Sequence, residues 1–240
     1  MNRDLTNSRY MEQIRLSGQP PVQIILRRSP RARRLSLRVS RLDGRVTMTL
    51  PKRTPLREAK GFATEKADWI RQALTERPTP ERPQIGQTIL FEGHQVPILA
   101  GPGRIARYHD GAIRVPDTPE RVAPRLAAFF KLSARQRLTQ ASERYAAALG
   151  KPFGKIAIRD TRSRWGSCSS QGNLMYSWRL IMAPPAVLDY VAAHEAAHLV
   201  EMNHSPDYWA VVSQIYPDYQ NQRAWLRENG AILHRYRFSD

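Results

Sequence analysis

Apolar and polar residues alternate along the first part of the chain. Between Arg27 and Arg53 the alternation has the two-residue period of a strand with one buried face. Residues 42–45, Leu-Asp-Gly-Arg, interrupt it with the composition of a hairpin turn. We therefore predict antiparallel strands in this region, with one apolar face and one cationic face.

Apolar residues at helical spacing follow in residues 55–77. Thr54 is suited to cap this predicted helix, and Pro55 is suited to its first position. The prolines of residues 78–83 then indicate a linker. Residues 88–115 contain short strand-like pieces separated by glycine-containing turns, and we predict that they form an antiparallel meander.

A second helical segment is predicted for residues 118–149, with Gly150 as its stop. Residues 155–159 and 173–178 alternate as strands on either side of a polar loop. We expect the 173–178 strand to offer its edge to an extended peptide, which would add to it through backbone hydrogen bonds. Two short helices interrupted at Pro217 are predicted near the end of the chain.

The strongest chemical signal is the segment from His194 to His198, which has the form H-E-x-x-H. On a helix, positions four apart lie on the same face, so both imidazoles can reach one metal ion. Glu195 follows His194 by about 100° of helical rotation. Its carboxylate can therefore approach a water at the metal without coordinating the metal itself, as a general base must. Zinc is the ion that these ligands favour.

A catalytic zinc ion normally takes a third protein ligand. Glu201 would lie roughly 10 Å along the helix axis from the first histidine, at about 1.5 Å per residue, which is too far for an undistorted site. His204 is the better candidate if the helix ends near Asn203 and the chain turns back. Ser205 and Pro206 then have the composition of a new helix start.

These features resemble the YgjP-like zinc metallopeptidase family, which is related to the SprT-like peptidases. The resemblance rests on Trp-Gly-Ser-Cys-Ser at residues 165–169, on Pro184, and on the H-E-x-x-H-x5-H arrangement. It implies an α+β fold, in which a zincin-like metallopeptidase domain has a mixed or antiparallel sheet and a metal-binding helix. The site that it implies has zinc as its cofactor, Glu195 as general base, and His194, His198 and His204 as metal ligands.

The length of 240 residues suits one large domain or two small ones. We predict a basic, strand-rich region with a helix in residues 1–80, short antiparallel strands in residues 81–117, and the zincin-like domain in residues 118–240. No apolar run is long enough for a membrane span, and one cysteine cannot form an intrachain disulfide. We therefore expect a cytoplasmic protein that does not enter a membrane.

The net charge of +17 is uneven along the chain, with ten Arg or Lys residues against one Asp between Arg27 and Arg53. Clustered arginines attract phosphates, so this Arg-rich region is a candidate surface for nucleic acid or another polyanion. A solvated sheet face is the alternative interpretation. Nothing in the sequence specifies an oligomeric state.

Three further residues near the motif are candidates for chemistry. Arg164 could hold a substrate anion or steady a developing oxyanion, and Tyr208 could donate a hydrogen bond to that oxyanion. Cys168 lies in the loop of residues 161–172, and we interpret it as a packing residue rather than as a ligand or nucleophile.

The sequence leaves three functional hypotheses open. The first is a zinc-dependent metalloendopeptidase that acts on protein or peptide substrates, with Glu195 as general base. The second is a metal-dependent hydrolase of nucleotide phosphoanhydrides, such as a nucleoside triphosphate pyrophosphohydrolase. The third is a non-catalytic nucleic-acid-binding protein with a structural metal. An unchanged function after Glu195→Gln would favour the third hypothesis.

Overall fold

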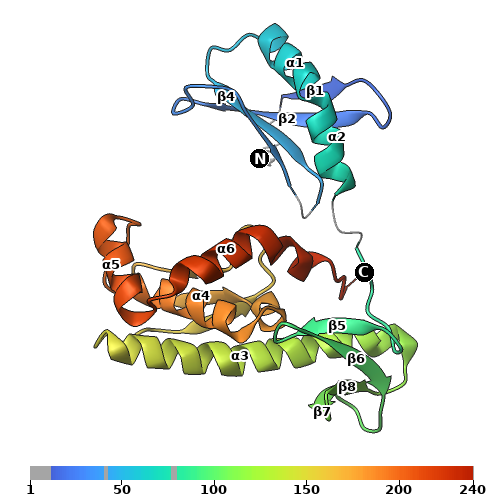
Figure 1. Ribbon diagram of the computed structural model, residues 1–240, viewed down its shortest axis with the longest axis vertical. Coiled ribbons are helices and arrows are strands. Elements are labelled where there is room, and N and C mark those ends of the chain that lie inside the picture. Colours follow the sequence, from blue (N-terminus) through green and yellow to red (C-terminus); the bar gives the residue numbers. More distant parts are fainter. Residues whose placement is uncertain (1–11, 41–42, 77–79, 240) are drawn as a thin grey trace, which may run out of the picture. The chain divides into compact units, whose positions relative to one another are not determined.

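The computed structural model describes residues 12–40, 43–76 and 80–239. It divides into two compact units, Met1–Pro78 and Thr79–Asp240 (Figure 1). Both units combine helices with mixed sheets, so the predicted α+β class is confirmed. Among the described residues, no helix has the length and apolar character needed to cross a membrane. The three-part division of the chain stays a prediction.

The first unit is a four-stranded sheet with two helices on one face. Its strands follow the order β1-β2-β4-β3. The β3–β4 hairpin is antiparallel, as predicted, but β4 also pairs with β2 in parallel. The antiparallel prediction for residues 27–53 therefore holds for β3 and β4 but not for the end of β2, because the hairpin places β4 beside β2 in parallel. The elements are β1 (Gln13–Leu16), β2 (Val22–Ser29), β3 (Ser36–Val39), β4 (Val46–Pro51), α1 (Leu56–Glu65) and α2 (Ala67–Thr75).

The single helix predicted for residues 55–77 is two helices, α1 and α2, which meet at Lys66. Pro55 is the N-cap of α1 and no side chain caps its first turn, so the predicted Thr54 cap was wrong. Alternate strand residues and the inner helix faces form one apolar core, which includes Ile24, Met48 and Ile70. The opposite face of the sheet contributes nothing to this core.

The second unit begins with a sheet of the same topology, in the order β5-β6-β8-β7. The predicted strands are present, but β6 and β8 pair in parallel, so the antiparallel meander is corrected here too. Both of its two-residue hairpin turns, Glu92-Gly93 and Asp110-Gly111, have positive φ angles. The strands are β5 (Thr88–Phe91), β6 (His94–Ala100), β7 (Arg107–His109) and β8 (Ala112–Val115).

A long helix and a three-stranded sheet enclose the candidate motif (Figure 1). The sheet has the order β10-β11-β9, and β11 pairs antiparallel with β10 and parallel with β9. One apolar core joins these elements to the β5–β8 sheet and to the C-terminal residues. The elements are η1 (Pro119–Arg121), α3 (Val122–Ala148), β9 (Ile156–Arg159), β10 (Gly166–Cys168), β11 (Leu174–Ser177), η2 (Trp178–Met182), α4 (Pro185–Ala197), α5 (Pro206–Ile215), α6 (Tyr219–Asn229) and η3 (Gly230–His234).

Arg179 binds the C-terminal residues to this core through hydrogen bonds. Its side chain is 8% exposed and pairs with Asp160, with 2.6 Å between Nε and Oδ1. Its Nη1 atom donates to the carbonyl oxygens of Leu233 and Tyr236 at 2.9 and 3.0 Å. The guanidinium also lies over the Trp178 ring, 4.7 Å from its centroid. One buried cation thus satisfies acceptors from two segments that are far apart in the sequence.

Replacing Arg179 by methionine is expected to destabilise the protein by about 3 kcal/mol, because two buried carbonyls and a carboxylate lose their partner. Urea denaturation would measure the change in unfolding free energy. The matched control is Arg137→Met, since Arg137 is 43% exposed and lies 3.7 Å from Glu92. That change should cost less than about 1 kcal/mol. Equal losses in both variants would contradict the anchoring role of Arg179.

Candidate metal centre

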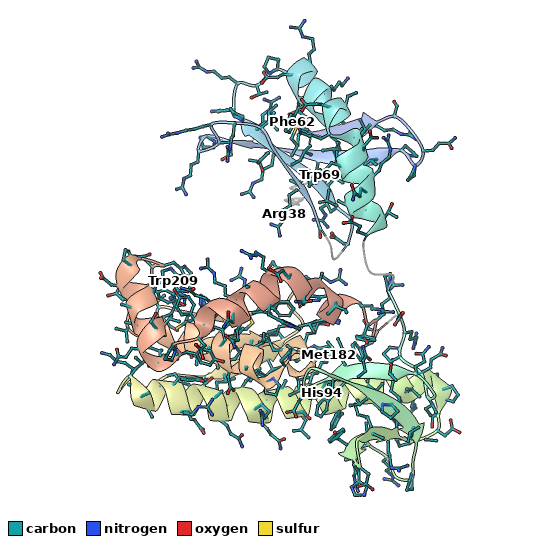
Figure 2. The ribbon with its side chains drawn as sticks, viewed as in Figure 1. Arg38, Phe62, Trp69, His94, Met182 and Trp209 are labelled. Carbon is teal, nitrogen blue, oxygen red and sulfur yellow. The ribbon has the colours of Figure 1, made fainter. Side chains whose placement is uncertain are left out.

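The H-E-x-x-H segment lies on α4, and the preceding hairpin fixes where that helix begins. The backbone amides of Glu92 and Gly93 donate to the carbonyls of Ile181 and Met182 at 2.8 and 3.2 Å. A side chain at Gly93 would lie 2.9 Å from the Cα atom of Pro184, so glycine permits this close approach. Figure 2 shows Met182 beside the strand that carries His94. The β5–β6 turn therefore supports the start of the motif helix.

The motif helix ends earlier than the sequence suggested. It stops at Ala197, and His198 is its C-cap, rather than continuing to Asn203. The chain then turns and enters α5. The predicted cap of this next helix is confirmed, because the Ser205 hydroxyl accepts a hydrogen bond from the Tyr208 amide at 3.3 Å. This turn returns the chain to the end of α4.

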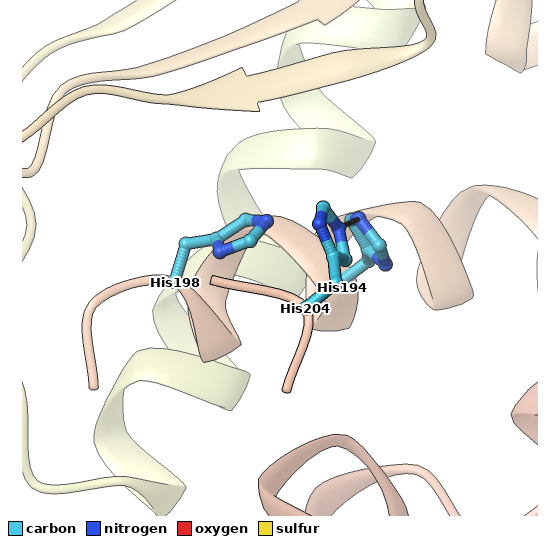
Figure 3. A group of neighbouring side chains, drawn as sticks. All are labelled: His194, His198 and His204. Carbon is cyan, nitrogen blue, oxygen red and sulfur yellow. Dashed lines mark hydrogen bonds between the residues drawn. The ribbon is translucent and has the colours of Figure 1, made fainter. Parts of the chain in front are cut away.

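The turn places three imidazoles together (Figure 3). The Nε2 atoms of His194 and His204 are 3.1 Å apart, and one ring nitrogen from each of the three histidines lies within 4.8 Å of the others. His198 Nδ1 lies 2.9 Å from the Glu201 carbonyl oxygen. Because a carbonyl only accepts, this nitrogen carries the proton and Nε2 keeps a free lone pair. Glu201 contributes its backbone to the site, and its carboxylate is not among the converging groups.

The surroundings of His194 and His198 favour the neutral form of these two imidazoles, which is the form that binds a metal ion. Burial and the neighbouring histidines lower the pKa of His194 to about 3. Burial also lowers the pKa of His198, although its contact with Glu201 opposes the shift. His194 is partly buried and His204 is exposed, so the group is open to solvent on one side.

Glu195 lies beside the histidines as a buried carboxylate. It is only 4% exposed. Burial raises its pKa to about 8, and the positive charge of Arg164 opposes this shift. A carboxyl group whose pKa is close to neutrality is well matched to taking up and releasing a proton.

Gly166 on β10 makes room for Glu195. A Cβ atom at this position would lie 2.4 Å from Glu195 Oε1 and 2.6 Å from its Cγ, closer than real side chains approach. In the sequence, Gly166 stands out only as one residue of the segment Trp-Gly-Ser-Cys-Ser at residues 165–169. A glycine inside a strand can mark a close approach, but only the folded chain shows that Glu195 is what approaches.

The three-stranded sheet has two edge strands, β9 and β10, and β10 is the one that packs against Glu195. The 173–178 strand was expected to offer an edge, but β11 is the central strand and pairs on both sides. The hydrogen bonds from Ser177 N to Trp165 O and from Ser169 N to Asn173 O show which residues of β10 face β11. Because strand residues alternate, the backbone groups of Gly166 and Cys168 point to the unpaired edge.

Tyr208 is placed for a structural role. Its ring is completely buried and stacks on His198, with 4.5 Å between ring centroids. Its hydroxyl donates to the backbone carbonyl oxygen of His194 at 2.9 Å. The hydroxyl is therefore already used, and this geometry favours support of the motif helix over donation to a substrate.

Arg164 and Cys168 both lie close enough to the Glu195 carboxylate for their charges to interact. The Arg164 side chain is exposed, and its backbone oxygen accepts a hydrogen bond from the Thr161 hydroxyl at 2.8 Å. Cys168 packs against the apolar core. Burial and the nearby Glu195 charge raise its thiol pKa, which disfavours the nucleophilic thiolate. A packing role for Cys168 agrees with this environment.

A comparison with known protein families identifies the family to which this chain belongs. A sequence profile described as "YgjP-like, metallopeptidase domain" matches residues 33–229. The chain belongs to the YgjP-like family. The resemblance drawn from residues 165–169, Pro184 and the histidine spacing is thereby confirmed, and the YgjP-like assignment supports a metal-dependent peptidase. The match extends into both compact units, and in the first unit it includes β3, β4, α1 and α2 but not β1 and β2.

Two further comparisons were made. Among solved structures, the chain is similar to the crystal structure of the metallopeptidase zymogen of Pyrococcus abyssi abylysin. The identity is 18%, the TM-score is 0.34, and the similar region covers 40% of this chain and 95% of the abylysin chain. A comparison with curated proteins finds no match.

Proposed function

We propose that this YgjP-like protein is a zinc-dependent metalloendopeptidase. The observation that carries the proposal is that Glu195, on the same helix as His194 and next to it in sequence, packs its carboxylate against Gly166 of the edge strand β10. The three histidines, Glu195 and β10 would serve as metal site, general base and peptide-binding strand.

The donor set supports zinc as the ion. Three imidazoles converge with one open side, and a catalytic zinc site usually has three protein ligands and one free position. The contact of His198 with the Glu201 carbonyl is the kind of outer hydrogen bond that orients a ligating imidazole. His194, His198 and His204 would hold the ion. When bound, zinc supplies Lewis-acid activation of water and polarises a carbonyl oxygen.

Residues of the chain itself would carry out proton transfer, substrate binding and stabilisation of the oxyanion. Glu195 accepts a proton from the attacking water and then passes it to the leaving amine. A substrate segment adds to the backbone groups of Gly166 and Cys168 as a further strand. Such binding depends on an extended backbone, so exposed or unfolded protein segments are the proposed substrates. Arg164 carries its charge beside Glu195 and is our candidate for steadying the developing oxyanion.

The proposal is tested with an unfolded polypeptide and a nucleoside triphosphate as parallel substrates. We expect the zinc-loaded protein to cleave the polypeptide internally and to leave the triphosphate intact. Treatment with a chelator should stop cleavage, and added zinc should restore it. Hydrolysis of the triphosphate without cleavage of the polypeptide would instead establish the phosphoanhydride alternative.

Replacing His204 by alanine is expected to remove most of the bound zinc, because two histidine ligands hold the ion far less tightly than three. Elemental analysis of the purified protein would measure this, with about one zinc per chain expected in the wild type. His109→Ala is the matched control, since the His109 side chain is 71% exposed and pairs with Asp110, the next residue in the chain. Equal zinc contents in the wild type and His204→Ala would contradict the assignment of the third ligand.

The cytoplasmic location and the polyanion partner of the Arg-rich region stay predictions. A hydrogen bond from Tyr208 to the substrate also stays a prediction from the sequence. It is not part of the proposed mechanism, because the Tyr208 hydroxyl donates to the backbone carbonyl oxygen of His194.

A further inference from the structure

Within the first unit, α1 and α2 cover one face of the sheet, and no described element of that unit covers the other face. Buried residues such as Ile24 and Met48 point toward α1 and α2, so the residues that alternate with them point to the other side. Figure 2 shows Arg38 on the strands, away from Phe62 of α1. The open face consists of Gln13, Arg15, Gln23, Ile25, Arg27, Ser36, Arg38, Thr47 and Thr49.

The charges on the two sides of this unit differ sharply. The open face carries Arg15, Arg27 and Arg38 and no acidic residue among the described positions. Helices α1 and α2, with Lys66 between them, carry four basic residues (Arg57, Lys60, Lys66 and Arg71) and three acidic ones (Glu58, Glu65 and Asp68). Unbalanced positive charge is therefore concentrated on the open face of the sheet. A surface that serves only to keep the protein soluble does not require such a separation of charge.

The arginines of the open face are free to bind a ligand. Within the part of the chain that the structure describes, none of the three has a hydrogen-bond or ion-pair partner. By contrast, the neighbouring Arg28 points the other way and is held by Glu12 and by the carbonyl oxygen of Thr54. The exposed Arg31, Arg33 and Arg34 extend the positive charge beyond the end of β2.

The strand register spreads these cations over the face. Arg38 lies in one row with Thr47 and Ile25, whereas Arg27 lies in the next row with Thr49 and Ser36. Two strand spacings of about 4.8 Å separate Arg27 from Arg38 across the sheet. Hydroxyl groups lie between them, and these can also bond to phosphate oxygens. Spread cations with interleaved hydroxyls suit a repeating polyanion better than a single small anion.

We infer that the open face of the β1-β2-β4-β3 sheet binds the phosphate backbone of nucleic acid without reading its sequence. The face has no aromatic residue among its described positions, so bases have nothing to stack on, and the binding comes from the backbone. This activity is separate from peptide hydrolysis and needs none of the metal-site residues. It would hold the peptidase near proteins that are themselves bound to nucleic acid.

The test measures binding of the full-length protein to a fluorescent 20-nucleotide single strand and to the matching duplex, by fluorescence anisotropy over a range of salt. The double variant R27Q/R38Q should bind the single strand at least about 10-fold more weakly, and the slope of log K against log salt should fall by about 1.4 for two lost phosphate contacts. R27K/R38K keeps the charge and should retain most of the binding. Comparison of the two nucleic acids identifies which form is preferred.

R57Q/K60Q is the matched control, because it removes the same charge from the exposed side of α1. It should change the affinity by less than about twofold at moderate salt. Equal losses in both double variants, or no loss in R27Q/R38Q, would overturn the inference. The inference would also be overturned if polyglutamate displaced the labelled strand as effectively as unlabelled nucleic acid of equal charge. Thermal unfolding of each variant shows whether a loss of binding reflects a loss of fold.

Discussion

Replacing Glu195 by glutamine is expected to lower kcat for peptide hydrolysis by about 100- to 10,000-fold, the usual contribution of a general acid or base. Glutamine has nearly the same shape as glutamate but cannot accept a proton. The side chain is almost completely buried beside the three histidines, so no other carboxylate can easily take its place. The measurement is the rate of polypeptide cleavage at saturating substrate, with zinc content determined on the same samples.

Glu201→Gln is the matched control for this change. Glu201 contacts the site through its backbone carbonyl, so loss of its carboxylate should leave both cleavage and zinc binding nearly unchanged. The Glu195 variant should also keep its zinc, because Glu195 is not among the converging ligand groups. Full activity in Glu195→Gln would show that proton transfer is carried by another group, and the proposed mechanism would fail.

Replacing Gly166 by alanine is expected to lower kcat by roughly 100-fold, although position 166 carries no functional group. The new methyl group would occupy the space of the Glu195 carboxylate, 2.4 Å from Oε1. Because Cγ is also too close, at 2.6 Å, the whole Glu195 side chain should shift, and we expect this shift rather than unfolding of the strand. A displacement of about 1 Å at a reacting group is enough for a loss of this size.

Two measurements separate this effect from general damage to β10. Thermal unfolding of Gly166→Ala should occur close to the wild-type temperature, and its zinc content should be unchanged. Ser167→Ala alters the same strand on its opposite face, and it should retain most of the activity. If Gly166→Ala is as active as the wild type, the close packing of Gly166 on Glu195 does not set the position of the base.

The features that could be predicted from sequence are local along the chain. His194 and His198 share a helix face because of the helical repeat alone, and Ser205 caps the next helix through a bond to the amide three residues later. The turn that returns His204 to the site was predictable for the same reason. Only its starting point differed, since α4 ends at Ala197.

The features that the sequence did not predict depend on partners far along the chain. Strands β2 and β4 have the alternation of ordinary hairpin strands, and nothing in it shows that they pair in parallel. The same limit applies to the expected substrate edge at residues 173–178. The alternation of residues there was correct, but β10 covers one side of β11 and takes the edge position. Gly166 could not be recognised as the neighbour of Glu195 before the chain was folded.

All three histidines come from one short segment, with His194 and His204 only ten residues apart. Closing so short a loop removes little chain entropy, and the apolar core of the second unit is assembled by contacts that do not involve the ion. We therefore expect the protein to fold on leaving the ribosome whether or not zinc is at hand. In a cell with little zinc, the protein would then be folded but inactive, and binding of the metal alone would make it active.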